Sequence, residues 1–387
     1  MRKTIFNSLM LAGLMLAPMA MTSCLNSDDE TIILEVVNTG IPDDSQATPN
    51  PTVPYPNAVV PNIQTTLDNS GGVPVIRIDM TGISDENYNW LRLYGTGSPD
   101  QNVWVEVDGK AKGILVINNE DDGSHAIKTD VIFTVDNSGS MSEEANAIAR
   151  DIKEWATQLA NSGLDVRFGI VGYGGYIDGA IDMTTVSELS NYLDAASGTS
   201  RTKQFGGSNA STLKNYANAF PRTSSSVDGA ECGAMAIEFA DRYFSFRPGA
   251  NRIYVNFTDE PNQPNHNEDY SVEFFKEQSN WPAAKGTVHT VFSASQFTYN
   301  NILTKEQPWL ISDYTGGTTI FTSSSFTGVT LSSLPVTGAM QHSYIIRFAN
   351  VAELLDGRAH LVHITVVSRD GNVRADKTFT AVFGTAN

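Results

Sequence analysis

The sequence has little cysteine and few basic residues. Only Cys24 and Cys232 occur among the 387 residues, and lysine plus arginine total 25 against 43 acidic residues. The resulting net charge of -18 argues against a nucleic-acid-binding protein, because a phosphate backbone needs a basic surface. The mean hydropathy of -0.19 argues against a protein that crosses a membrane many times, whereas 41% hydrophobic residues are enough for a core.

The N-terminus has the pattern of a secretory signal. Arg2 and Lys3 precede an apolar run of roughly residues 5–21, and small residues then lead to Cys24. The segment 21–24, Met-Thr-Ser-Cys, resembles a bacterial lipobox with Met in place of the usual Leu. The resemblance implies that residues 1–24 are a lipoprotein signal peptide and that Cys24 is lipidated. The alternative is an ordinary cleaved signal with an incidental cysteine.

The residues after Cys24 bear on where such a lipoprotein is sent. Leu25, in place of Asp, disfavours retention in the inner membrane by resemblance to known lipoproteins. The run 27–30, Ser-Asp-Asp-Glu, resembles an acidic tag for export to the outer surface, and its alternative is a solvated linker. Residues 25–70 are rich in Pro, Asn, Asp, Ser and Thr, which predicts a flexible tether. We therefore expect an outer-membrane lipoprotein, exposed at the cell surface and attached to the membrane only by lipid.

The flanks of the chain have the two-residue period of β-strands. Alternation is visible in the N-terminal flank at 73–79, 90–94 and 103–107, and in the C-terminal flank at 344–348 and 360–367. Neither flank has enough strands for a good sandwich alone, but together they supply about seven, a usual number. We therefore expect residues 71–125 and 336–387 to form one β-sandwich into which the middle of the chain is inserted.

The middle of the chain, residues 126–335, alternates between strand and helix patterns. This order predicts an α/β fold with a doubly wound, mostly parallel sheet of the Rossmann-like kind. Cys232 falls on an apolar helix face, which favours a buried thiol. The expected strands are 131–135, 166–173, 180–183, 252–257 and 287–293, and the expected helices are 142–160, 186–196, 232–243 and 271–279.

Oxygen-bearing side chains gather at the ends of these strands. Asp136, Ser138 and Ser140 follow the first strand, where ligands bind in such folds. Asp259 ends a later strand, and Glu231 opens the helix before it. Carboxylate and hydroxyl oxygens suit Mg²⁺, with Ca²⁺ or Mn²⁺ as alternatives. The pattern predicts a divalent cation site at this edge of the sheet.

Residues from about 128 to 325 resemble a von Willebrand factor type A domain, and Asp136-x-Ser138-x-Ser140 resembles its metal-ion-dependent adhesion site. The resemblance implies that these three side chains contact the metal directly or through water, and that Asp259 lies on the third loop of the site. For the second loop, residues 228–231, Asp-Gly-Ala-Glu, resemble the integrin β variant, in which Glu231 takes the role. The alternative is Ser208, which lies farther ahead of Asp259 than one helix and a turn require.

A second cation site next to the first is also implied by the resemblance. Its candidate residues are Glu143, Glu144 and Asp228. The sequence departs from the family pattern at two positions near this site. Ala230 replaces a proline, and Ser226 stands where an Asn would contribute. The alternative for the two glutamates is that they are solvated residues of a first helical turn, favoured there by the helix dipole.

These patterns lead to one expected function and two alternatives. We expect a surface protein that holds Mg²⁺ and uses it to bind an acidic group of a protein or extracellular-matrix ligand. One alternative is a subunit of a bacterial surface fibre or secretion assembly. The other is a metal-dependent hydrolase, which would need a general base near the ion, and the sequence offers no dedicated candidate. We therefore expect no enzymatic activity.

Overall fold

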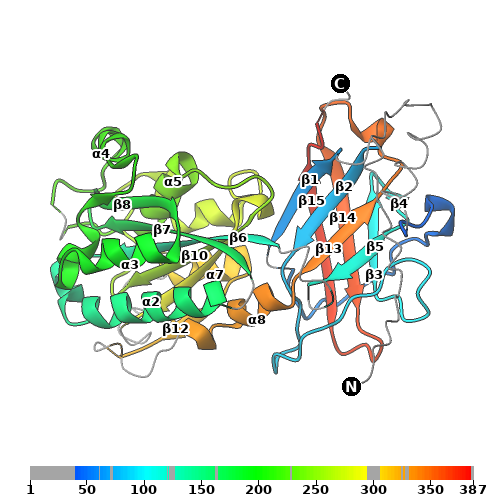
Figure 1. The fold of residues 1–387 in the computed structure, drawn as a ribbon, viewed down its shortest axis with the longest axis horizontal. Helices are drawn as coiled ribbons and strands as arrows, with labels where there is room; N and C mark the ends of the chain where they lie inside the picture. Colours follow the sequence, from blue (N-terminus) through cyan, green and yellow to red (C-terminus); the bar gives the residue numbers. More distant parts are fainter. Residues whose placement is uncertain are drawn as a thin grey trace, which may run out of the picture.

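The computed structural model describes residues 40–60, 62–69, 73–119, 121, 127–161, 164–226, 229–293, 306–323, 326 and 331–384. Two regions lie side by side, which we call the α/β domain and the flank domain (Figure 1). The expected signal peptide with Cys24, and Asp228 of the expected second cation site, fall outside the described residues.

The α/β domain is built on a seven-stranded sheet with the order β12-β11-β10-β6-β7-β8-β9. All neighbouring strands are parallel except β7 and β8, so the expected mostly parallel sheet is confirmed. Its strands are β6 (Lys128–Asp136), β7 (Asp165–Tyr173), β8 (Ile177–Thr184), β9 (Phe205–Gly206), β10 (Asn251–Thr258), β11 (Thr287–Phe292) and β12 (Thr319–Phe321).

Helices cover both faces of this sheet, and alternate residues of β6 show why. Val131 and Phe133 pack in the hydrophobic cluster that contains Trp155 of α2, whereas Ile132 packs in the cluster that contains Phe239 of α5. Successive side chains of a strand point to opposite faces, so a central strand that is buried on both faces needs a helix layer on each side. The helices are α2 (Ala145–Asn161), α3 (Val186–Asp194), α4 (Ala210–Ala219), α5 (Gly233–Tyr243), α7 (Trp309–Thr315) and α8 (Pro335–Gln341).

Two local expectations in this domain differ from the structure. The helix expected over 271–279 is instead a short 3-10 helix, Val272–Lys276, which follows another, Glu268–Tyr270. The polar stretch from 199 to 227 contains α4, which buries only Leu213 and Ala217. Two apolar anchors are too few for a clear helical period, which is why the pattern did not reveal α4.

The flank domain consists of two four-stranded sheets, with the orders β1-β2-β13-β5 and β15-β14-β3-β4. Every strand pair in them is antiparallel. Segments from before and after the α/β domain alternate, because β13 lies between β2 and β5, and β14 pairs with β3. One hydrophobic cluster takes residues from both sheets. The strands are β1 (Ile63–Asp68), β2 (Val75–Met80), β3 (Val103–Val107), β4 (Lys110–Ala111), β5 (Leu115–Asn118), β13 (Tyr344–Phe348), β14 (His360–Val367) and β15 (Arg374–Ala381).

The tether expected over residues 25–70 needs a correction at its C-terminal end. β1, at 63–68, pairs with β2 along its whole length. Farther upstream, the Asn50 amide donates to the His363 carbonyl (3.1 Å) and to the Thr365 hydroxyl (3.0 Å). The described residues from 40 to 68 therefore belong to the flank domain. Their prolines suggested a linker, but side-chain hydrogen bonds and one strand attach the segment.

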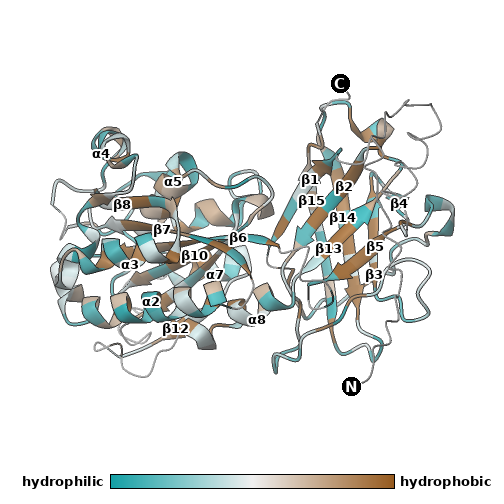
Figure 2. Ribbon diagram, viewed as in Figure 1, coloured by the Kyte–Doolittle hydropathy of each residue, from teal (hydrophilic) through white to brown (hydrophobic). Residues whose placement is uncertain are grey.

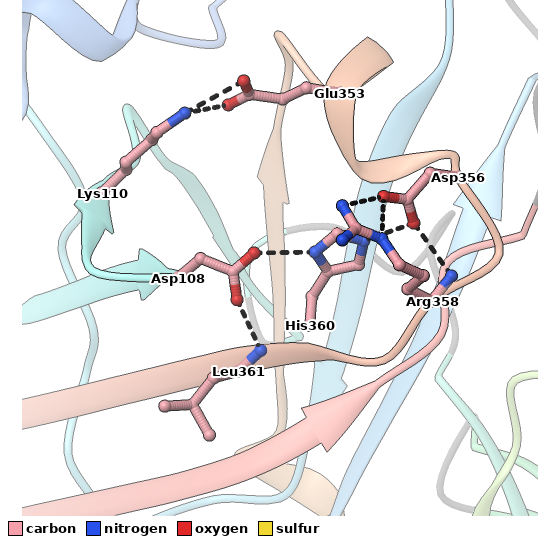
Figure 3. Close-up of polar contacts among 7 residues, drawn as sticks. All are labelled: Asp108, Lys110, Glu353, Asp356, Arg358, His360 and Leu361. Carbon is pink, nitrogen blue, oxygen red and sulfur yellow. Dashed lines mark hydrogen bonds and ion pairs between the residues drawn. The ribbon is translucent and has the colours of Figure 1, made fainter.

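A polar cluster joins the two halves of the flank domain (Figure 3). The imidazole of His360 lies between two carboxylates, with Nδ1 2.8 Å from Asp108 and Nε2 3.1 Å from Asp356. Nearby, the Lys110 ammonium donates to Glu353 at 2.8 Å. Asp108 and Lys110 precede the α/β domain in the chain, and their partners follow it. The cluster therefore fastens a turn of the N-terminal segment to the C-terminal one.

The hydropathy of the ribbon agrees with this division into layers. The strands of the α/β domain are predominantly hydrophobic, whereas the strands of the flank domain and the helices of the α/β domain carry hydrophilic residues as well (Figure 2). Among the residues that the structure describes, no helix combines the length and the apolar character needed to cross a membrane.

The amino ends of the parallel strands face the flank domain. The Asn62 amide donates to the Arg252 carbonyl near the start of β10 (2.6 Å), and the Gln64 amide donates to the Ala284 carbonyl just before β11 (2.6 Å). The carboxyl ends of the same strands consequently point away from the flank domain (Figure 1). The edge that holds the expected cation site is therefore the one farthest from the other domain.

Candidate metal centre

Asp136 is the last residue of β6, the central strand, and is almost fully buried at 1% exposure. Its carboxylate accepts a hydrogen bond from the Ser138 amide (2.9 Å) and one from the Thr258 hydroxyl (3.1 Å). Thr258 ends β10, which neighbours β6 in the sheet. The side chain is thus held in place by its own loop and by the next strand.

The two serines connect this carboxylate to the end of β10. The hydroxyl oxygens of Ser138 and Ser140 lie 3.1 Å apart, and Ser140 donates to the Asp259 carboxylate at 3.1 Å. The loop turns through a 3-10 helix, Gly139–Ser142, which sets both hydroxyls on the same side of the strand end. Asp136, both serines and Asp259 therefore meet at one point of the sheet edge, as expected from the sequence.

Glu231 reaches the same point from the loop before α5. It is 8% exposed, accepts a hydrogen bond from the Ser138 side chain, and lies close enough to Asp136 and Asp259 to be affected by their charges. The preceding residue, Ala230, has a φ of 57°, a left-handed conformation that is unusual for a residue with a side chain. The Thr223 hydroxyl donates to the Ala230 carbonyl (2.5 Å), which holds this turn in place.

Burial raises the pKa of all three carboxylates, and neighbouring carboxylates add to it at Asp136 and Glu231. Burial first, and then the neighbouring Asp259, raises the pKa of Asp136 to about 7. Burial together with Asp136, Glu260 and Asp259 raises the pKa of Glu231 to about 8. Burial also raises the pKa of Asp259. In the described part of the chain, none of the three has an ion pair with Lys, Arg or His.

The donor set fits a hard divalent cation. Three carboxylates and two hydroxyls supply only oxygen, which suits Mg²⁺. Within the described residues, no group of three or more His, Cys, Asp or Glu side chains is arranged to hold a metal ion. The carboxylates would therefore not suffice alone, and the Ser138 and Ser140 hydroxyls between them would have to belong to the ligand set.

The alternative second-loop residue lies elsewhere. Ser208 follows β9, the edge strand, which is separated from β6 by β7 and β8. Since β9 runs parallel to β8, and β8 antiparallel to β7, the chain after β9 heads toward the opposite edge of the sheet. Of the two candidates, the structure brings only Glu231 to Asp136.

The two glutamates expected at an adjacent cation site differ in their exposure to solvent. Glu143 is exposed, as an ordinary residue of a first turn would be. Glu144 is 2% exposed and accepts a hydrogen bond from Ser293 at 3.2 Å, while its other carboxylate oxygen has no partner among the described residues. Burial, Asp259 and Glu143 raise its pKa. Glu144 therefore lies near Asp259, whereas Glu143 faces solvent.

A hydrogen-bonded layer beneath the site was not evident in the sequence. The Asn256 amide oxygen accepts from the Thr134 hydroxyl (2.8 Å) and from the Tyr173 hydroxyl (3.0 Å), all three side chains being buried. A Cβ on Gly233 would lie 2.7 Å from the Asn256 amide nitrogen, so only glycine lets α5 approach this closely. The only signal in the sequence was a polar residue within each of two apolar strands, Thr134 in β6 and Asn256 in β10, which are paired in the sheet.

Comparisons with known proteins do not place the chain in a family. The sequence matches no protein-family profile and no curated protein. Solved structures similar to it include an aerotolerance-related membrane protein from Bacteroides fragilis (17% identity, TM-score 0.31, covering 55% of this chain and 98% of that one). Others are BatB from Bacteroides thetaiotaomicron (15%, 0.32, 55% and 96%) and the pilus adhesin SpaC from Lactobacillus rhamnosus GG (10%, 0.35, 84% and 56%). At these scores the likenesses carry no argument about function.

Proposed function

We propose that the α/β domain is a von Willebrand type A-like binding module that holds Mg²⁺ and uses it to bind an acidic group of a protein or matrix ligand. Asp136, Ser138, Ser140, Glu231 and Asp259 would hold the ion. The observation that carries the proposal is the meeting of these five side chains at one sheet edge, where none of the carboxylates has an ion pair among the described residues. A bound Mg²⁺ would neutralise the buried carboxylates and offer an open coordination position to a partner's carboxylate.

The position of the site supports a role in binding large partners. It lies at the edge of the domain that points away from the flank domain, so a macromolecule can approach it. We propose further that the two flank sheets form a β-sandwich and that this sandwich, with a lipidated Cys24, attaches the module to the cell surface. The lipobox-like sequence supports the attachment, and the shared hydrophobic cluster supports the sandwich.

The first test measures stabilisation by Mg²⁺. Thermal melts of the intact protein in Mg²⁺ and in EDTA should differ, because a ligand at 100 times its Kd adds about 2.7 kcal/mol to the free energy of unfolding. Asp136→Ala should fold but lose this difference. Glu154→Ala, an exposed residue of α2, serves as the matched control and should keep it. Identical wild-type melting curves in Mg²⁺ and EDTA would contradict the proposal.

The second test concerns the partner. Binding to immobilised extracellular-matrix proteins and to bacterial surface extracts should require Mg²⁺ and be lost in Asp136→Ala. Retention of only bacterial fibre or secretion proteins would favour the assembly-subunit alternative. Hydrolysis of a peptide or glycan by the purified protein, lost in the same variant, would favour the hydrolase.

A further inference from the structure

A groove runs along the boundary between the two domains, at the opposite edge of the sheet from Asp136. It consists of two adjoining cavities of about 250 and 310 Å³. They share the wall residues 57–58 and 84–86. Their combined size falls in the range of sites for small ligands, roughly 300–1,000 Å³. The groove is independent of the candidate metal centre, because no residue of that centre lines it.

The deep end of the groove is largely apolar, and a histidine offers a hydrogen-bond donor there. Ile253 and Val336 line it, together with His289, which is 4% exposed. The Thr318 amide donates to His289 Nδ1 (3.1 Å), so the proton of the neutral ring is on Nε2. Among the hydrogen bonds of the described residues, none involves His289 Nε2. A ligand in the cavity could therefore accept a hydrogen bond from this nitrogen.

The rim of the groove presents an aromatic ring on a constrained loop. The Asp85 carboxylate accepts hydrogen bonds from the amides of Asn87 and Asn89, both at 2.9 Å. Between them Tyr88 has a φ of 60°, and 55% of its surface is exposed. A left-handed backbone is unfavourable for a residue other than glycine, and such strain gathers at binding sites. The loop thus holds a large aromatic residue exposed at the groove, at a cost to stability.

The charges of the groove define the class of ligand. Its described lining includes the carboxylates of Asp85 and Glu86 but no Lys or Arg, which disfavours phosphate, sulfate and other anionic ligands. A peptide would seek free backbone groups, yet the amides of Asn57 and Ala58 in the wall both donate to the Arg374 carbonyl. Hydroxyl-rich, uncharged molecules with apolar ring faces match an aromatic rim, an exposed carboxylate and an imidazole donor.

We propose that this groove binds a short neutral oligosaccharide. The Tyr88 ring contacts a sugar face, the Glu86 carboxylate accepts from sugar hydroxyls, and His289 Nε2 donates to a sugar oxygen at the deep end. Such a site would give the protein a second, metal-independent contact with a glycan-bearing surface.

A glycan array with neutral, sialylated and sulfated oligosaccharides, followed by calorimetry on the best neutral ligand, tests the proposal on the intact protein. We expect neutral glycans alone to bind. Tyr88→Asn, which tolerates the left-handed backbone but removes the ring, should weaken binding at least tenfold, whereas Tyr88→Phe should retain it. Glu86→Gln should weaken binding several-fold. Circular dichroism of each variant verifies that the fold is intact.

The outcomes separate this groove from the metal centre. Binding should persist in EDTA and in Asp136→Ala, so loss of the Mg²⁺ response would leave the glycan result unchanged. Absence of any neutral glycan binding on the array, binding of acidic glycans only, or equal affinity of wild type and Tyr88→Asn would each overturn the proposal.

Discussion

The α/β domain and the flank domain both bury apolar strands, but the chain connects their strands in different ways. The α/β domain uses one continuous stretch, and each parallel strand reaches its neighbour through a crossover, mostly a helix. The flank domain pairs strands from the two ends of the chain, such as β2 with β13 and β3 with β14. One domain is therefore formed by a continuous segment of the chain, whereas the other requires pairing between segments far apart in the sequence.

The junction shows how the two are connected. The Asn119 amide donates to the Ser343 carbonyl (2.9 Å), so the chain leaves the flank domain beside the point where it returns. Once folded, the α/β domain holds its two ends together and removes most of the entropy cost of closing that long loop. We infer that the stability of the flank domain depends on the α/β domain more than the reverse.

The largest expected effect tests this asymmetry. Phe133 is fully buried and packs against Trp155 and Phe168 at ring-centroid distances of 5.9 and 6.4 Å. Phe133→Ala should cost about 3–5 kcal/mol and should lower the urea midpoint of both domains. Hydrogen exchange measured by mass spectrometry along a urea series reports on peptides of each domain separately.

The matched variant lies in the other domain. Ile346 of β13 is also fully buried, and Ile346→Ala should cost about 2–5 kcal/mol. We expect it to lower the midpoint of the flank domain only. If Phe133→Ala left the exchange of flank peptides unchanged, or if both variants affected both domains equally, the proposed dependence would be wrong.

Acid should destabilise the α/β domain through His289. Burial lowers the pKa of this imidazole from 6.5 to about 4, so between these values the unfolded state binds more protons than the folded state. The stabilisation is complete above pH 6.5 and declines as the pH falls toward 4, by about 3 kcal/mol in all. As the pH falls from 7 to 4, the urea midpoint of the wild type should fall relative to that of His289→Gln. A constant difference would show that burial does not perturb the histidine.

The flank domain should respond to pH in the opposite direction, and less strongly. Hydrogen bonds to Asp108 and Asp356 raise the pKa of His360 (Figure 3). The folded state therefore holds the proton more tightly, and the stabilisation is complete below pH 6.5 and disappears as the pH rises through the raised value. In His360→Gln, the flank domain should lose this dependence and the α/β domain should be unaffected. Nuclear magnetic resonance titration of His360 would reveal a pKa at or below 6.5 if the prediction is wrong.

The reliability of the sequence predictions followed the length and regularity of the local pattern. The buried stripe of α2 and the apolar run of β6 identified the α/β fold, because long periodic segments report directly on which face is buried. Placing Asp136 and Asp259 at one edge followed from parallel strand direction alone. In contrast, β1 and α4 were missed, since their apolar positions are few and stand among prolines or polar residues.

Chain order and residue period thus determined the fold class, the central motif after β6 and the alternation of faces. Only the tertiary structure decided between Glu231 and Ser208, because the choice depends on the direction of β8 and β9, which the residues of neither loop encode. The same holds for the groove at the domain boundary and for the bridge from Asp108 to His360. Each joins segments far apart in the chain, and their contact results from the packing of whole domains.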